Sequence, residues 1–230
     1  MHAISFALFL MFVQRSDAPA PPPMLVVTGS AEILVVPDEA TVRLGIVRQS
    51  TNAQAAQEQA NATAQEILNA IGKAGVPANQ IQTARLVLSP VYAPRDSRDA
   101  PRIVAYNATN SVSVRVDNLS LVGAVIDAGL KAGANQLDGV QFGLRNDLPS
   151  REEALKQAVQ EARSKAQVMA DTLRVNLLDV LEASEGGVSI MPVAEAGMAQ
   201  RLSIAADTPV SPGQIQVHAN VTIRYRISPK

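Results

Sequence analysis

The sequence of 230 residues contains no cysteine and no tryptophan, and aromatic residues make up only 3% of it. Without cysteine the chain can form no disulfide and has neither a thiolate nucleophile nor the usual zinc frameworks. The few aromatic rings leave little surface on which sugars or nucleic-acid bases could stack. The composition therefore argues against several large classes of binding and catalytic site.

Neither sign of charge dominates, since 20 Lys and Arg residues stand against 21 Asp and Glu residues. A net charge of −1 gives no field that would draw the protein onto nucleic acid or an anionic membrane, so we expect no nucleic-acid partner. The apolar fraction of 47% is large enough to build a hydrophobic core. The composition thus favours a folded protein.

Long hydrophobic runs are also absent, apart from residues 3–13. As a helix this run would span only about 16 Å, against the roughly 30 Å hydrocarbon core of a membrane. The small-x-small motif Ala18-Pro19-Ala20 and a run of prolines follow it. The pattern predicts a signal peptide over residues 1–20, a Pro-rich linker over 21–24 and no stable transmembrane insertion. A buried N-terminal helix is the alternative interpretation. An exported protein that contains no cysteine is typical of the bacterial periplasm.

The most regular pattern in the chain is the alternation of polar and apolar residues over 214–227. Because successive side chains of a strand point to opposite faces, this segment predicts a long strand with one buried face and one wet face. Such strands are typical of antiparallel sheets that are covered on one side. The apolar side chains are those of Ile215, Val217, Ala219, Val221, Ile223, Tyr225 and Ile227.

Six further segments read as strands, namely 24–36, 41–49, 81–92, 104–116, 137–144 and 177–184. We expect the first two to pair as an antiparallel hairpin, because Pro37-Asp38 is a turn signal between them. Gly29 predicts a bulge or bend in the first strand. The segment 186–213 is expected to be irregular, packed either on its own domain or on a neighbouring subunit.

Helical spacing of apolar residues predicts three helices, which begin near Thr51, near Asp117 or Asn118, and near Ser150. Capping boxes are expected at the first and third, with Gln54 and Glu153 as the partners of Thr51 and Ser150. The third helix, over 151–174, carries a narrow seam of small residues, with Glu161 on the adjoining polar face. The small residues of the seam are Ala158, Ala162 and Ala166, within an apolar stripe that comprises Leu155, Ala158, Val159, Ala162, Ala166, Met169 and Leu173. The seam should let the helix lie close to a sheet.

These elements predict an α+β fold, in which antiparallel sheets of long one-sided strands are covered on one face by Ala-rich amphipathic helices. We expect a single domain over residues 25–230. The alternative is a division of this domain into two half-units that meet near 93–101.

Several segments, in their order and spacing, resemble the SIMPL-domain family of mostly bacterial exported proteins. They are Val27-Thr28-Gly29, Pro37-Asp38-Glu39-Ala40, Leu88-Ser89-Pro90-Val91-Tyr92, Ala105-Tyr106-Asn107-Ala108-Thr109-Asn110, Gly133-Ala134-Asn135, the helix over 154–170 and Thr208-Pro209-Val210-Ser211-Pro212-Gly213. The resemblance implies sheets backed by helices, export to the periplasm, homo-oligomers in some members, and links to envelope and oxidative-stress responses. It implies no catalytic residues.

Few residues are candidates for chemistry. His218 would be the single histidine after signal cleavage, and it falls on the polar face of the last strand, where a lone imidazole makes neither a zinc site nor a triad without a nucleophile. The acid pairs Asp38-Glu39 and Glu152-Glu153 fit a turn and the first turn of a helix. We therefore assign no catalytic, cofactor-binding or metal-binding residue and expect no cofactor.

The sequence thus predicts an exported, non-enzymatic periplasmic protein that acts as a homo-oligomeric assembly or binding protein. A further protein or small-molecule partner is left open. The alternative is a hydrolase-like periplasmic enzyme whose site the sequence does not reveal. The shortage of nucleophiles, bases and metal ligands distinguishes the two hypotheses.

Overall fold

The structure is a computed structural model, and it describes residues 22–94, 101–193 and 208–230. The predicted signal peptide over 1–20 lies outside the described residues. The strands are β1 Met24–Val35, β2 Glu39–Ser50, β3 Ile81–Tyr92, β4 Ile103–Val116, β5 Gln136–Gly143, β6 Val175–Val193 and β7 Gln214–Pro229. The helices are α1 Ala53–Lys73, α2 Val122–Lys131 and α3 Leu148–Leu173, with short 3-10 turns at Ala78–Gln80 and Leu119–Leu121.

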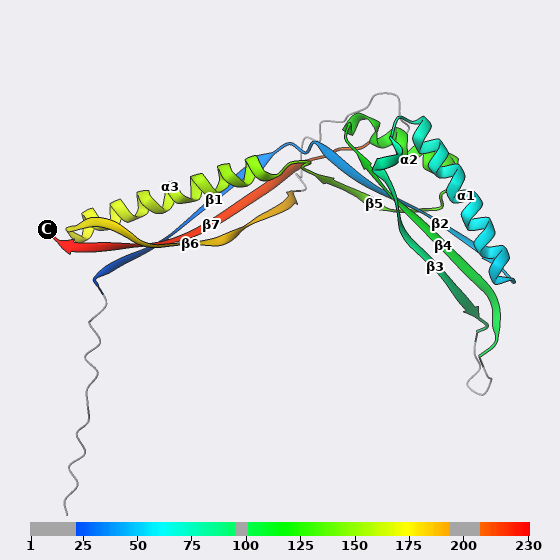
Figure 1. Cartoon of the computed structure of the whole chain (residues 1–230), viewed down its shortest axis with the longest axis horizontal. Coiled ribbons are helices and arrows are strands. Elements are labelled where there is room, and N and C mark those ends of the chain that lie inside the picture. Colours follow the sequence, from blue (N-terminus) through cyan, green and yellow to red (C-terminus); the bar gives the residue numbers. More distant parts are fainter. Residues whose placement is uncertain (1–21, 95–100, 194–207) are drawn as a thin grey trace, which may run out of the picture.

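The strands form two antiparallel sheets that lie end to end in an elongated molecule (Figure 1). One sheet has three strands in the order β1-β7-β6, and the other has four in the order β3-β4-β2-β5. In each sheet, helices cover one face: α3 lies on the three-stranded sheet, and α1 and α2 lie on the four-stranded sheet. The predicted α+β fold with one-sided strands is confirmed.

The predicted hairpin of the first two strands is wrong. β1 pairs along its whole length with β7, whereas β2 pairs with β4 and β5 in the other sheet. The Pro37-Asp38 turn signal instead lies where the chain crosses from one sheet to the other. The prediction failed because a local turn signal does not decide which distant strand a segment will pair with.

The four-stranded sheet, formed within residues 39–143, is inserted in sequence between β1 and the rest of the three-stranded sheet. The chain crosses at 36–38 and returns at 144–147. The two crossings are tied together, because the Arg145 N–H donates to Asp38 Oδ1 at 2.7 Å and the Asp38 N–H donates to the Gly143 carbonyl. The residues near 93–101, named above as an alternative boundary, lie in sequence between β3 and β4, which pair within one sheet.

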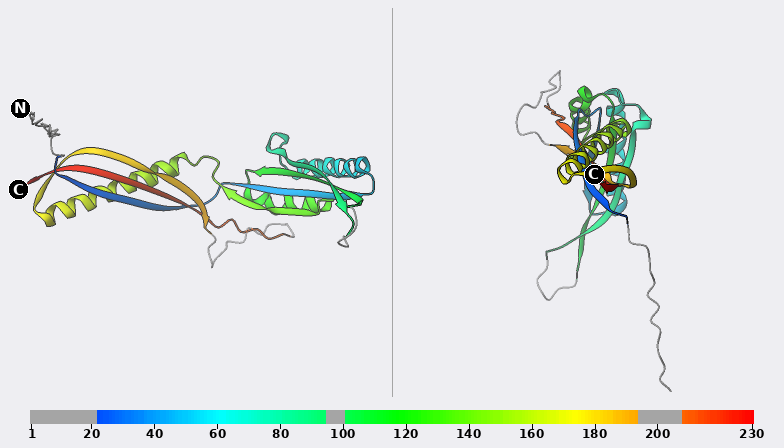
Figure 2. Two further views of the ribbon diagram at one scale, coloured as in Figure 1. Left: turned by 90° about the horizontal axis from the view of Figure 1, so that it is seen from below. Right: turned by 90° about the vertical axis from the view of Figure 1, so that its left-hand side faces the viewer.

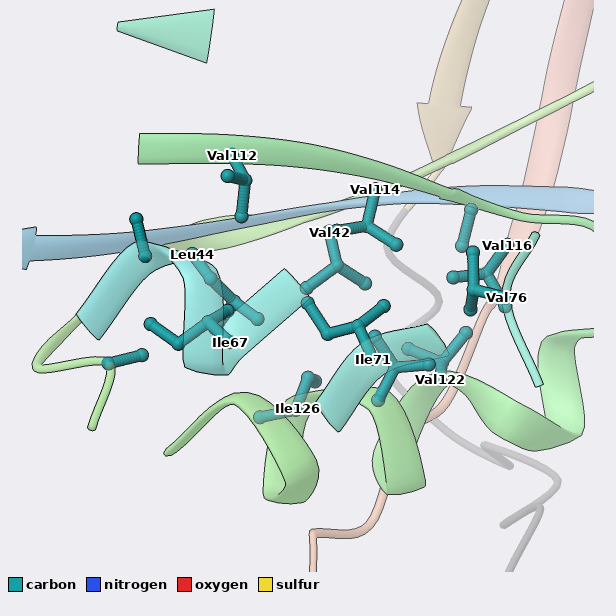
Figure 3. Close-up of a cluster of buried hydrophobic side chains, with 14 of the residues drawn as sticks. Val42, Leu44, Ile67, Ile71, Val76, Val112, Val114, Val116, Val122 and Ile126 are labelled. Atoms are coloured by element: carbon teal, nitrogen blue, oxygen red, sulfur yellow. The ribbon is translucent and has the colours of Figure 1, made fainter. Parts of the chain in front are cut away.

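The core of the four-stranded sheet is made of aliphatic side chains. Val42 and Leu44 of β2 and Val114 of β4 are fully buried against the helices. Figure 3 shows Ile67 and Ile71 of α1 pointing toward these strands, with Val122 and Ile126 of α2 beside them. The period-2 pattern of the strands and the helical period of α1 therefore meet in one apolar layer.

The core of the three-stranded sheet is narrower, because the face that α3 buries is made of alanine. The buried residues of α3 are Ala154, Ala158, Ala162, Ala166 and Ala170. Val159, Met169 and Leu173, which the sequence placed in the apolar stripe of this helix, are exposed, and Leu155 lies at the margin of the buried seam. Small side chains form the seam because only they fit where the helix axis lies close to the strands.

Gly29 permits this close approach, and of the predicted bulge or bend no bulge forms there. The register of β1 with β7 shows no shift. A Cβ atom at Gly29 would overlap the Ala158 carbonyl oxygen and lie 2.6 Å from the Ala162 backbone nitrogen. Glycine is needed here because the helix backbone occupies the space of a side chain.

The helix starts also differ from the predicted capping boxes. Asn52, and not Thr51, caps α1 by accepting a hydrogen bond from the Ala55 N–H at 3.0 Å. The third helix begins at Leu148, with Pro149 in its first turn and no side-chain cap from Asp147. Pro149 fits there because its missing N–H has no partner in a first turn.

The sixth strand is longer than predicted. β6 continues to Val193 and pairs with β7 over this stretch, so residues 186–193 are strand and not the irregular segment we expected. Residues 194–207 of that segment lie outside the described residues. Val210, beyond them, packs against the core of the four-stranded sheet, and Thr208 donates a hydrogen bond to Asp127 of α2 at 2.6 Å.

Candidate interaction surfaces

The candidate residue His218 lies on the uncovered face of the three-stranded sheet. The register places it directly between Glu32 of β1 and Ser189 of β6. Residues opposite one another in an antiparallel pair have Cβ atoms roughly 4.5–5.5 Å apart. The row Glu32–His218–Ser189 therefore brings a carboxylate, an imidazole and a hydroxyl together, although no hydrogen bond joins these side chains in the described structure. Sequence reasoning missed the row because register alone creates it.

The two acid pairs occupy structural positions. Asp38 accepts a hydrogen bond from the Arg145 N–H at the crossing between the sheets, and Glu153 accepts one from Gln157 at 2.8 Å within α3. Within 22–94, 101–193 and 208–230, no group of three or more His, Asp or Glu side chains is placed to hold a metal ion. Among these residues, no helix is long and apolar enough to cross a membrane.

A groove of about 690 Å³ runs between α3 and β6. It lies on the same face of the three-stranded sheet as α3, over the part of that face that the helix does not cover. Leu155 and Val159 form its helix wall, and Val180 stands on the strand wall. The floor is the buried face of the central strand, with Ile223 and Tyr225. We call this feature the α3–β6 groove. Its size and apolar lining are typical of small-molecule sites.

The groove exists because α3 crosses the sheet obliquely while β6 bows away from it (Figure 2). The register of β6 with β7 shifts three times, between Leu177 and Val180, between Val180 and Glu182, and between Glu185 and Gly187. Bulges bend a strand and increase its twist, so the wall of the groove coincides with the part of β6 that departs from the regular sheet.

On its other side, α3 is held to the free edge of β1 by polar contacts. The Ser30 N–H donates to the Glu161 carboxylate, and Lys165 donates to the Thr28 carbonyl at 3.2 Å. Glu161 and Lys165 also form an ion pair at 2.9 Å. The hydrogen bond from the Ser30 backbone, followed by that from Lys165, lowers the pKa of the Glu161 carboxyl below its ordinary value. Glu161, expected on a freely solvated face, therefore helps to position the helix.

The groove side of α3 carries different charges. Arg163 lines the helix wall and Glu185 lines the strand wall. Neither side chain forms a hydrogen bond or an ion pair with the described residues, in contrast to Glu161 and Lys165 on the opposite side of the helix. An apolar floor thus lies between one uncompensated cation and one uncompensated anion.

A second apolar surface lies on the β3–β4 hairpin. Leu86 and Leu88 of the edge strand β3 stand opposite Asn110 and Ala108, so they share the face that α1 covers. They nevertheless remain 58% and 45% exposed. Together with three exposed side chains nearer the end of the hairpin they form what we call the hairpin surface, made of Leu86, Leu88, Tyr92, Ile103 and Val104.

Comparison with known proteins assigns the fold to a family. The family model SIMPL, described as a protein of unknown function (DUF541), matches residues 25–225, which cover the strands and helices of both sheets almost completely. The chain belongs to the SIMPL family. The resemblance seen in the sequence segments is thereby confirmed.

Individual relatives of this SIMPL protein cover most of its length. The 26 kDa periplasmic immunogenic protein of Brucella melitensis is 32% identical, over 94% of this chain and 89% of the relative. The uncharacterized protein YggE of Edwardsiella ictaluri is 24% identical, over 93% of this chain and 87% of the relative. YggE of Escherichia coli K12 is 26% identical over 70% of this chain and 64% of its own length.

Proposed function

We propose that this SIMPL protein is exported to the periplasm and acts there as a non-enzymatic homo-oligomer, in association with envelope or oxidative stress. The name of the Brucella relative supports the compartment. The apolar run over residues 3–13 supplies the export signal. The described amino-terminal and carboxyl-terminal ends lie together at the far end of the three-stranded sheet, where Ile227 donates to the Pro23 carbonyl, so a removable leader would leave the fold intact.

The hairpin surface carries the proposal of self-assembly. β3 is an edge strand of 12 residues, and edge strands present unpaired backbone groups to solvent. Arg85 is its only charged residue, so the edge is protected by little charge, although Pro90 and two register shifts with β4 also interrupt it. Exposed apolar side chains beside such an edge are typical of protein–protein interfaces. A second copy of the chain would cover both the edge and the apolar side chains.

Light scattering of the chain without residues 1–20 tests self-assembly. We expect a mass that is a multiple of the monomer, and we expect Leu88→Lys to reduce it. Leu130→Lys on α2 is the matched control, since Leu130 is 43% exposed and lies away from the edge. A monomeric parent, or an unchanged mass for Leu88→Lys, would show that the hairpin surface is not an interface.

Cell fractionation tests the compartment. The protein should be found in the periplasmic fraction in a form shortened at its amino terminus, and deleting residues 3–13 should retain it in the cytosol. A full-length product in the cytosol would contradict export.

A peroxide challenge tests the role in stress. A deletion strain should be sensitive to peroxide, and the intact gene should restore its resistance, whereas the Leu88→Lys variant should not if assembly serves the stress response.

The enzymatic alternative rests on the row Glu32–His218–Ser189. A hydroxyl next to an imidazole and a carboxylate is the set of groups used by serine hydrolases, but the row lies on an open sheet face without a hydrogen bond between its members. We expect no hydrolysis of p-nitrophenyl acetate above that of a His218→Ala variant. A rate that disappears in both His218→Ala and Ser189→Ala would favour the hydrolase.

A further inference from the structure

We propose that the α3–β6 groove binds a single-chain amphiphile with a zwitterionic headgroup, such as a lysophospholipid. The proposal is independent of self-assembly, because the groove lies in the three-stranded sheet and the hairpin surface lies in the other sheet.

The shape of the groove fits one extended acyl chain. Its helix wall extends from Leu155 to Gln167, which corresponds to about 18 Å along the helix axis. The strand wall runs alongside from Leu177 to Glu185. The volume of about 690 Å³ lies within the usual range of small-molecule sites, roughly 300–1,000 Å³. A long slot with apolar walls and floor suits a flexible hydrocarbon chain.

The uncompensated charges of the groove select the headgroup. A phosphate would satisfy Arg163 on the helix wall, and an ammonium group would satisfy Glu185 on the strand wall. A fatty acid would satisfy Arg163 alone and would leave Glu185 without a partner charge. A headgroup with both charges is therefore favoured over a simple anion.

The construction of the sheet keeps the groove open. The alanine seam and Gly29 seat α3 closely on β1 and β7, and the contacts of Glu161 and Lys165 hold it there. The three register shifts of β6 turn that strand away from the helix. Val180 and Leu178 consequently remain half exposed although they belong to an apolar wall. An acyl chain in the groove would remove these side chains from water, and burial of apolar surface drives binding.

Isothermal titration calorimetry of the full chain with 14-carbon lysophosphatidylethanolamine, below its micelle concentration, tests the proposal. We expect one ligand per chain. Val159→Asp should abolish binding, because it places a carboxylate in the helix wall. Val168→Asp is the matched control: Val168 lies on the other side of the same helix and is 63% exposed, against 41% for Val159, so its variant should bind like the parent. No binding by the parent, or equal binding by both variants, would overturn the site.

Headgroup variants test the role of the charges. Arg163→Gln and Glu185→Gln should each weaken binding of the lysophospholipid by about tenfold, the usual effect of losing a charge-assisted hydrogen bond. Myristic acid should bind more weakly than the lysophospholipid, and Glu185→Gln should improve its binding. Equal affinities of the two ligands for the parent would overturn the headgroup assignment. A lower solution mass of Val159→Asp without any ligand would instead assign the groove to an interface between copies.

Discussion

At the scale of single residues, glycine and alanine decide how the helix-covered layer of the three-stranded sheet is built. Gly29 and Ala162 face one another across the contact between β1 and α3, where neither position has room for a further methyl group. Because interiors are close-packed, such contacts transmit even a small change in volume to the backbone.

Gly29→Ala should therefore destabilise the protein by at least about 1–3 kcal/mol, since the new Cβ atom would collide with the helix backbone. Gly72→Ala is the control, because Gly72 lies exposed in the last turn of α1 with no atom within 4 Å of an added Cβ. There alanine should stabilise by at most about 0.5–1 kcal/mol through its higher helix propensity. Urea denaturation measures both changes, and equal midpoints for the two variants would contradict the close approach.

The contact between Glu161 and the Ser30 backbone predicts a pH dependence. The pKa of this carboxyl is lower in the folded protein than its ordinary value of 4.5. Its contribution to stability is thus present above that value and is lost as the pH falls through the folded-state pKa. Glu161→Gln should lower the urea midpoint at pH 7 and should approach the parent as the pH falls below 4.5 and through the folded-state pKa. Glu66→Gln, on the exposed side of α1, should change neither midpoint, and a pH-independent loss in Glu161→Gln would refute the electrostatic origin.

At the scale of elements, α3 presents three different sides. The alanine seam packs on the sheet, one flank clamps the edge of β1 through Glu161 and Lys165, and the other flank forms the wall of the groove. A helix with only small buried side chains is seated by close packing, and its larger apolar residues are left at the margins. This division explains why Val159 and Met169 are exposed.

Ala162→Leu should cost about 1–3 kcal/mol, because it forces a larger side chain into the fully buried seam. Gln160→Leu places the same side chain on the exposed side of α3, and its effect should stay within about 0.5 kcal/mol. The free energy of unfolding from urea titration compares the two variants. A parent-like Ala162→Leu would show that the helix does not lie as close to the sheet as described.

At the scale of the whole molecule, the two sheets have separate hydrophobic cores. The buried cluster around Leu44 includes α1 and α2, whereas the cluster around Val217 includes α3. The crossings at 36–38 and 144–147 join the two parts and are tied by the bond between Arg145 and Asp38. Regions with separate cores can open with different free energies.

Hydrogen exchange should therefore separate the effects of core mutations. Leu44→Ala should cost about 2–5 kcal/mol and should speed amide exchange mainly in β2 and β4, since it leaves a cavity in the four-stranded layer. Ala162→Leu should speed exchange mainly in β1 and β7. Uniform acceleration throughout the chain by both variants would indicate one cooperative unit.

The sequence by itself determined the faces of the strands and the small-residue face of the third helix. The alternation over 214–227 places Ile215, Val217 and Tyr225 on the buried face of β7, and the structure buries them. Helical spacing likewise identified Ala158 and Ala162 as buried. These features could be predicted because the direction of a side chain depends on the local period of the backbone, 2 residues in a strand and 3.6 in a helix.

Only the tertiary structure decided which distant segments meet. β1 pairs with β7 and not with β2, and this pairing brings Glu32 beside His218 and seats Gly29 under α3. The groove likewise depends on where α3 crosses the sheet and on the shifted register of β6. Local patterns cannot determine these features, because many pairings would satisfy the same alternation of polar and apolar residues. The choice among them depends on packing between segments far apart in the sequence.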